Sequence, residues 1–77
     1  MIIIEVDAIQ RAQKLELRID ERILAGEMAE GIRRILGDET AGFLWGIESR
    51  GILTPDLSID DHNINNGERL LYISKTT

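Results

Sequence analysis

The sequence predicts an α+β domain in which one helix crosses one face of a β-sheet and leaves the other face open to solvent. The chain has 77 residues, enough for a single domain over residues 1–77 with one hydrophobic core. Hydrophobic residues make up 43% of the chain and charged residues 30%, as in folded globular proteins. The apolar residues follow a strand period first, a helical period next, and short strand-like runs afterwards.

Two alternating segments, residues 2–7 and residues 14–20, open the chain. Their period of two indicates two strands, each with one wet face. The connection between them has no Gly, Asn or Pro, so we infer the hairpin from the alternation and not from turn residues. The apolar members are Ile2, Ile4 and Val6 in the first segment and Leu15, Leu17 and Ile19 in the second.

The period changes to that of an amphipathic helix from Glu21 onward. Asp20 is suited to cap the helix N-terminus, and Gly37 to end the helix in the left-handed conformation. Gly26 and Gly31 each disfavour a helix interior by about 1 kcal/mol relative to Ala. We expect close approach of the helix to the sheet to require both glycines. The residues of the apolar helix face are Leu24, Met28, Ile32, Ile35 and Leu36.

The second half of the chain predicts three further strands. Residues 43–47 form the first, with Phe43 and Trp45 expected to point toward the helix. A turn over residues 48–51 follows, and the short apolar stub before Pro55 suits an edge strand. A loop and a tight turn at residues 65–67 then lead into the last strand. The remaining ranges are 52–53 for the stub, 57–64 for the loop and 69–73 for the last strand.

The charge balance and the missing cysteines exclude several classes of function. Fourteen acidic residues against nine basic ones give a net charge of -5, which would repel a nucleic-acid backbone. The chain has no cysteine, which removes disulfides and thiolate chemistry and suits a reducing compartment. Glu5 and Asp7 interrupt the apolar start, so we expect neither a signal peptide nor a membrane insertion, and a cytoplasmic location. A domain this small is not expected to enclose a large active site.

Two stretches of the C-terminal third resemble a known family. Residues 57–64, Leu-Ser-Ile-Asp-Asp-His-Asn-Ile, resemble the Leu-Ser-Asp-Tyr-Asn-Ile turn of ubiquitin. Residues 64–70, preceded by Asp61, are similar to the D-x-x-I-x-N-G-D-R-L stretch of the YukD/EsaB family, with Glu68 in place of Asp. The resemblance implies a ubiquitin-like β-grasp fold, with a mixed sheet of four to five strands and one helix. It also implies an association with type VII (WXG-type) secretion systems in bacteria.

The C-terminal residues differ from those of conjugated modifiers and sulfur carriers, which activate a Gly-Gly carboxylate. Residues 74–77 read Ser-Lys-Thr-Thr and contain no Gly. We therefore expect no role as a modifier or carrier, in agreement with the YukD/EsaB resemblance, because that family also lacks the diglycine.

The polar residues of the chain predict no catalytic, cofactor-binding or metal site. The cluster Asp60-Asp61-His62 has no second His and no predicted cleft. We expect one of its carboxylates to cap the local turn and the His62 ring to bond a nearby carbonyl. Arg33 and Arg34 have acidic neighbours on the helix, which favours a solvated face over a phosphate site.

The predicted protein-binding patch is the set of apolar residues left on the open face of the sheet. If Phe43 and Trp45 point to the helix, the pleat sends their neighbours to the other face. A contiguous apolar patch usually marks an interface, and Glu5 and Arg69 would form its polar rim. The alternative is that the four patch residues are ordinary strand formers on a partly covered sheet. The patch residues are Ile3, Leu44, Leu71 and Ile73.

The sequence thus predicts a non-catalytic protein–protein interaction module, a cytoplasmic accessory component of a type VII secretion system. The expected partner is a protein, such as a membrane component or ATPase of that system, or a second copy of the chain. A ubiquitin-like adaptor in another bacterial pathway is the first alternative, and a carboxyl-activated modifier or carrier is the second. Nucleic acid and cofactors are not expected.

Overall fold

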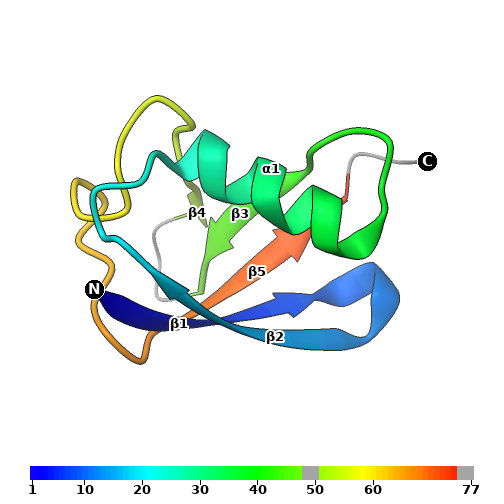
Figure 1. Ribbon diagram of the computed structural model, residues 1–77, viewed down its shortest axis with the longest axis horizontal. Coiled ribbons are helices and arrows are strands. Elements are labelled where there is room, and N and C mark those ends of the chain that lie inside the picture. Colours follow the sequence, from blue (N-terminus) through cyan, green and yellow to red (C-terminus); the bar gives the residue numbers. More distant parts are fainter. Residues whose placement is uncertain (48–50, 75–77) are drawn as a thin grey trace.

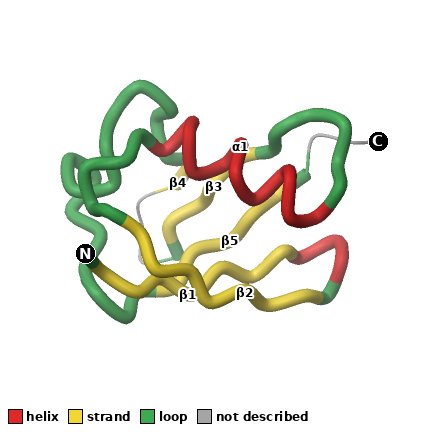
Figure 2. The backbone as a smooth tube through the Cα atoms, in the orientation of Figure 1, coloured by secondary structure: helices red, strands yellow, loops and turns green. Residues whose placement is uncertain are grey.

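The computed structural model describes residues 1–47 and 51–74, which form a five-stranded mixed sheet and one helix (Figure 1). The strand order is β2-β1-β5-β3-β4, and α1 packs across one face of the sheet (Figure 2). The predicted α+β class, with a mixed sheet of four to five strands and one helix, is confirmed. The elements are β1 (Ile2–Ala8), η1 (Ile9–Arg11), β2 (Gln13–Ile19), α1 (Ala25–Leu36), β3 (Phe43–Gly46), β4 (Gly51–Ile52) and β5 (Arg69–Ile73).

The hairpin of β1 and β2 turns without the usual turn residues. A single 3-10 turn, η1, follows β1, and Ala12 then takes the left-handed conformation with φ of 50°. The Ala12 N–H donates to the Ile9 carbonyl at 3.2 Å, which closes the turn. Local hydrogen bonding therefore compensates for a residue type that rarely takes this conformation, and alternation was the only sequence signal for this hairpin.

The first and last strands lie side by side in the middle of the sheet. β5 runs parallel to β1 and antiparallel to β3, so it joins the β1–β2 hairpin to the β3–β4 pair. β4 is only two residues long, as the short stub before Pro55 predicted, but it spans residues 51–52 and not the predicted 52–53. Gly51 has φ of 69°, as its predicted turn requires, whereas residues 48–50 of that turn and residues 75–77 lie outside the described residues.

The helix begins four residues later than its apolar period suggested. It starts at Ala25, where the Glu27 side chain accepts a hydrogen bond from the Leu24 N–H at 3.2 Å. Gly37 ends it as predicted, in the left-handed conformation with φ of 77°. Ile35 was assigned to the apolar face but is 56% exposed.

The prediction that Asp20 caps the helix is wrong, because Asp20 holds a separate turn. Its carboxylate accepts hydrogen bonds from the Arg22 N–H at 3.0 Å and the Arg22 guanidinium at 2.9 Å. The side-chain bond from Arg22 is the main cause that lowers the pKa of Asp20 to about 2. The Ile23 carbonyl of the same turn accepts from the Ile59 N–H at 2.9 Å, which anchors this segment to a distant loop.

Of the two helix glycines, only Gly26 is explained by close approach, and its neighbour is Pro55 in the loop after β4, not the predicted sheet. A Cβ on Gly26 would lie 3.1 Å from the Pro55 Cβ and 3.2 Å from its carbonyl oxygen. A Cβ on Gly31 would meet nothing within 4 Å, so the expectation for Gly31 is wrong. Nothing in the described residues explains why position 31 is a glycine.

The core lies between α1 and the covered face of the sheet, and it corrects the predicted facing of β3. Leu44 is 2% exposed, whereas Phe43 and Trp45 are 40% and 38% exposed. Leu44 and Gly46 are thus the β3 residues that point toward the helix. They need less space than Phe43 and Trp45 would in the region where the helix packs against β3. The buried apolar residues are Ile4, Val6, Ala8, Ala25, Met28, Ala29, Ile32, Leu44, Leu53, Ile59, Ile64, Leu70 and Tyr72.

Candidate protein-binding face

The open face of the sheet carries a contiguous apolar patch over β5, β3 and β4. Trp45 lies opposite Leu71 on one side and opposite Ile52 on the other, and Phe43 lies opposite Ile73. Directly opposed residues point to the same face of a sheet. We call these five residues the open-face patch. Ile52 is 54% exposed, and Leu71 and Ile73 are half-buried.

Two of the four residues predicted for the patch belong to the open-face patch of the structure. Leu71 and Ile73 lie in it, but Leu44 is buried in the core. Ile3 is 36% exposed on the open face, opposite Arg18. It lies about 13 Å along β1 from Asp7, the β1 neighbour of Leu71, so it does not join the patch. The two aromatic members were missed because apolar residues fill both faces of β3 apart from Gly46.

Charged residues, together with Ile3, occupy the other half of the open face, over β1 and β2. Glu5 lies opposite Arg69 of β5, which confirms that both predicted rim residues share this face. Glu5 also lies opposite Glu16, a like-charged pair, and Asp7 lies opposite Lys14. The open face is therefore divided into an apolar half and a charged half of mixed sign.

The apolar surface continues around the β4 edge into a cleft beside the helix. Ile52 and Phe43 belong to the open-face patch and also line this cleft, whose volume is about 220 Å³. The other lining residues are Ala25, Gly26, Ala29, Ala41, Gly42, Leu44, Leu53 and Pro55.

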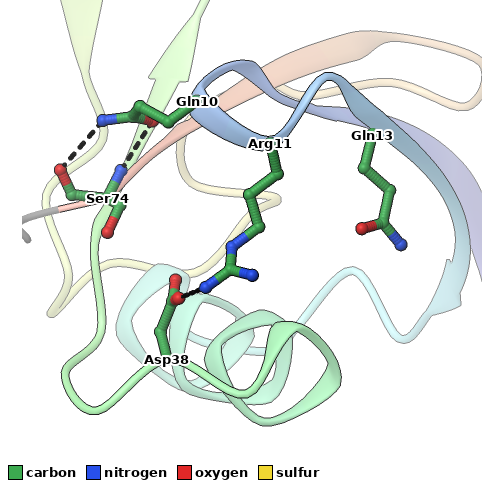
Figure 3. A pocket seen from close by; sticks show the side chains of 5 residues that line it. All are labelled: Gln10, Arg11, Gln13, Asp38 and Ser74. Atoms are coloured by element: carbon green, nitrogen blue, oxygen red, sulfur yellow. Dashed lines mark hydrogen bonds and ion pairs between the residues drawn. The ribbon is translucent and has the colours of Figure 1, made fainter.

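A second, polar pocket of about 580 Å³ lies at the end of the β1–β2 hairpin (Figure 3). Gln10 bonds the Ser74 backbone twice, at 3.2 and 3.1 Å, and Arg11 forms an ion pair with the buried Asp38. Arg33 also donates to the Asp38 carbonyl at 2.7 Å. Asp38 Oδ2 is buried with no hydrogen-bond partner among the described residues. The pocket residues thus tie together the hairpin, the end of α1 and the end of β5.

The Asp60-Asp61-His62 cluster forms the local turn that the sequence predicted. The Ser58 N–H donates to the Asp61 carboxylate at 3.3 Å, and the Asp61 N–H donates to the Ser58 hydroxyl at 2.9 Å. The His62 ring Nε2 lies 3.1 Å from the Thr54 carbonyl oxygen. Both predicted contacts are therefore confirmed.

We expect His62→Ala to lower the free energy of unfolding by about 1 kcal/mol, the scale of one hydrogen bond, and to leave partner binding intact. Urea denaturation, with Asp56→Ala in the same exposed loop as control, measures this change. Unchanged stability combined with lost partner binding would contradict a structural role for His62.

One cluster of ion pairs, centred on Glu30, lies on the outer side of the helix. Glu30 accepts hydrogen bonds from Arg33 at 2.9 and 2.7 Å, and Arg34 lies 3.7 Å from the same carboxylate. The Arg33 hydrogen bonds hold the pKa of Glu30 below its usual value. The solvated, charge-paired face expected for Arg33 and Arg34 is confirmed.

Neither a metal-binding cluster nor a membrane-spanning helix occurs among the described residues, 1–47 and 51–74. No group of three or more His, Cys, Asp or Glu side chains among them is placed to hold a metal ion. In the same residues, no helix has the length and apolar composition needed to cross a membrane.

Comparison with known proteins identifies the fold. The chain matches no protein-family model and no curated protein sequence. Among solved structures it is similar to the C-terminal ubiquitin-like domain of mouse tubulin-specific chaperone e, with a TM-score of 0.77, 16% identity, and coverage of 99% of this chain and 88% of that one.

Two further neighbours are a mycobacterial ubiquitin-like domain and a chain of an inner membrane complex. The ubiquitin-like domain of EccD5 from Mycobacterium xenopi has a TM-score of 0.68, 18% identity, and coverage of 92% of this chain and 90% of that one. A chain of the MycP5-free ESX-5 inner membrane complex also has a TM-score of 0.68 and 18% identity. The match there covers 99% of this chain but 22% of that longer one. These likenesses, with the strand order and the single helix, give this chain the ubiquitin-like fold.

Proposed function

We propose that the chain is a non-catalytic protein-binding module and that its partner docks on the open-face patch. The observation that carries this proposal is the exposure of Phe43 and Trp45. The chain has one Phe, one Trp and one Tyr, and the first two lie on the open face while Tyr72 is buried. A domain of this size loses core area by leaving its two largest apolar side chains exposed.

The composition of the patch supports this assignment. Trp is the residue type most enriched among those that dominate binding energy, and aromatic anchors cluster at the centre of interfaces. Trp45 lies between Leu71 and Ile52, and the charged half of the face adjoins this group. An apolar centre with polar residues at its margin is the usual arrangement of a protein interface.

We further propose a role as a cytoplasmic accessory component of a type VII secretion system. Two lines of support point to it. Residues 61–70 resemble the YukD/EsaB stretch, which is associated with type VII secretion systems, and the fold is like that of the EccD5 ubiquitin-like domain and of a chain of the ESX-5 inner membrane complex. The partner we propose is a membrane component or the ATPase of such a system.

Binding measurements with two open-face variants test both parts of the proposal. We expect the chain to bind the purified cytoplasmic part of a membrane component, or the ATPase, of the secretion system encoded in the same genome. Trp45→Asp and Leu71→Asp should each weaken this binding by about 30-fold or more, as loss of a central anchor does. Isothermal titration calorimetry measures the affinities.

Ile35→Asp is the matched control, because Ile35 is exposed on the helix and not on the open face. It should bind as the unsubstituted chain does. Equal binding by all three variants would contradict the open-face assignment. If the unsubstituted chain binds none of these secretion proteins, the proposed pathway is wrong.

A further inference from the structure

β2 forms one edge of the sheet and presents a regular backbone to solvent. It pairs with β1 over all seven of its residues without a bulge, and no described strand lies on its other side. The opposite edge strand, β4, has two residues and lies close to Pro55 in the sequence. A long edge strand without Pro or a bulge is a template for pairing with another strand.

The hydrogen bonds on the far side of β1 determine which β2 residues face outward. The Glu5 N–H donates to the Glu68 carbonyl at 3.1 Å, and the Ile3 carbonyl accepts from the Gly67 N–H at 2.7 Å. Odd-numbered residues of β1 therefore direct their backbone groups toward β5. Because these groups alternate along a strand, the even-numbered residues of β1 bond to β2.

The register of the hairpin carries this alternation over to β2. Leu15 and Leu17 lie opposite even-numbered residues of β1, so their backbone groups point inward. The N–H and C=O groups of Lys14, Glu16 and Arg18 consequently point away from the sheet. The side chains of these three residues lie on the open face, and all three are exposed.

The charges along β2 are complementary to their own antiparallel copy when the two strands are centred on Leu17. In that register Glu16 lies opposite Arg18 of the second copy. Two-fold symmetry repeats this pair, so two opposite-charge pairs form. Glu16 and Arg18 are also residues whose backbone groups point outward, so each such pair can exchange N–H···O=C bonds.

The neighbouring registers lack this match. A pairing centred on Glu16 places Glu16 opposite itself and Lys14 opposite Arg18, and one centred on Arg18 places that residue opposite itself. A pairing centred on Leu15 places Lys14 opposite Glu16, which is favourable. It also brings Ala12 into the ladder, and the Ala12 φ of 50° is incompatible with a strand. Charge and backbone geometry thus favour one register.

We propose that β2 pairs with β2 of a second copy of the chain, antiparallel and centred on Leu17, and that this joins the two sheets into one. Leu17 then lies opposite its own copy on the helix side of the sheet, where it is half-buried in the single chain. The open-face patch lies on β5, β3 and β4, at the other end of the sheet. Both patches of the dimer therefore stay accessible, and this inference does not depend on the proposed function.

Reciprocal charge substitutions test the pairing by analytical ultracentrifugation at protein concentrations up to the millimolar range. Glu16→Arg and Arg18→Glu should each weaken self-association by about tenfold or more, because two opposing pairs become like-charged. An equal mixture of the two variants should form heterodimers, since every opposed pair then has opposite charges. Glu39→Arg, an equal change of charge on an exposed residue outside β2, should associate like the unsubstituted chain.

Amide hydrogen exchange locates the interface independently. The amides of Lys14, Glu16 and Arg18 should exchange more slowly as protein concentration rises, whereas that of Leu17, which already bonds to β1, should not change. The proposal is overturned by a chain that stays monomeric over this concentration range. A dimer that tolerates both charge substitutions, or one whose outward β2 amides stay unprotected, overturns it as well.

Discussion

Gly42→Ala should lower the free energy of unfolding by about 3 kcal/mol, the upper range for overpacking a well-packed site. A Cβ at position 42 would lie 2.2 Å from the Ile73 carbonyl oxygen and 2.9 Å from its carbonyl carbon. Both are backbone atoms of β5, so they cannot move without disturbing the ladder. The Gly42 N–H also donates to the Tyr72 hydroxyl at 2.7 Å, and a shifted backbone would strain this bond. Thermal and urea denaturation measure the loss.

Gly31→Ala is the matched control, because it adds the same methyl group where nothing lies within 4 Å. Position 31 lies inside the helix, where Ala is favoured over Gly by about 1 kcal/mol. We therefore expect Gly31→Ala to raise the melting temperature and Gly42→Ala to lower it. A similar change of the same sign in both variants would contradict the close contact at Gly42.

Leu44→Asp should unfold the chain, whereas Trp45→Asp should leave it folded. Leu44 is 2% exposed, and an unpaired carboxylate at its position would cost about 4 kcal/mol or more. A domain of this length is stable by only roughly 4–12 kcal/mol. Trp45 is 38% exposed on the open face, so its replacement should cost about 1 kcal/mol.

Far-UV circular dichroism and melting curves of the two variants separate these outcomes. The positions are adjacent in the chain and receive the same side chain, so strand propensity contributes little to the difference. If Leu44→Asp melts like the unsubstituted chain while Trp45→Asp unfolds, β3 faces the other way and the open-face patch is wrongly assigned.

The elements that have a clear apolar period, or that end at a residue typical of such an end, were predictable from the sequence. The last strand was placed at Arg69–Ile73 and the end of the helix at Gly37, both as observed. The start of the helix was not, because residues 20–24 bond to the distant loop. The Asp60 N–H donates to the Glu21 carbonyl at 2.8 Å, for example. Sequence periodicity contains no information about such long-range bonds.

The binding face was predictable, but not all of its residues. On β1 and β5 one face is richer in apolar residues, so alternation indicated which face Leu71 and Ile73 share. On β3 the run Phe-Leu-Trp-Gly-Ile has no polar side chain on either face. The larger side chains suggested that Phe43 and Trp45 point toward the helix, which is wrong. The space between the helix and β3 decides which β3 side chains point inward. That space depends on Ala25 and Ala29 of the helix, which line the cleft beside β3.

The central position of β5 determines when the chain can fold as the ribosome makes it. β1 and β2 can pair early, and β3 and β4 soon after, but nothing joins these two pairs until residues 69–73 emerge. Closing the parallel contact between β1 and β5 brings together segments more than sixty residues apart, such as Glu5 and Arg69. Such distant contacts slow folding. The nascent chain therefore exposes the inner edges of both strand pairs until residues 69–73 have emerged, and the sheet cannot close before then.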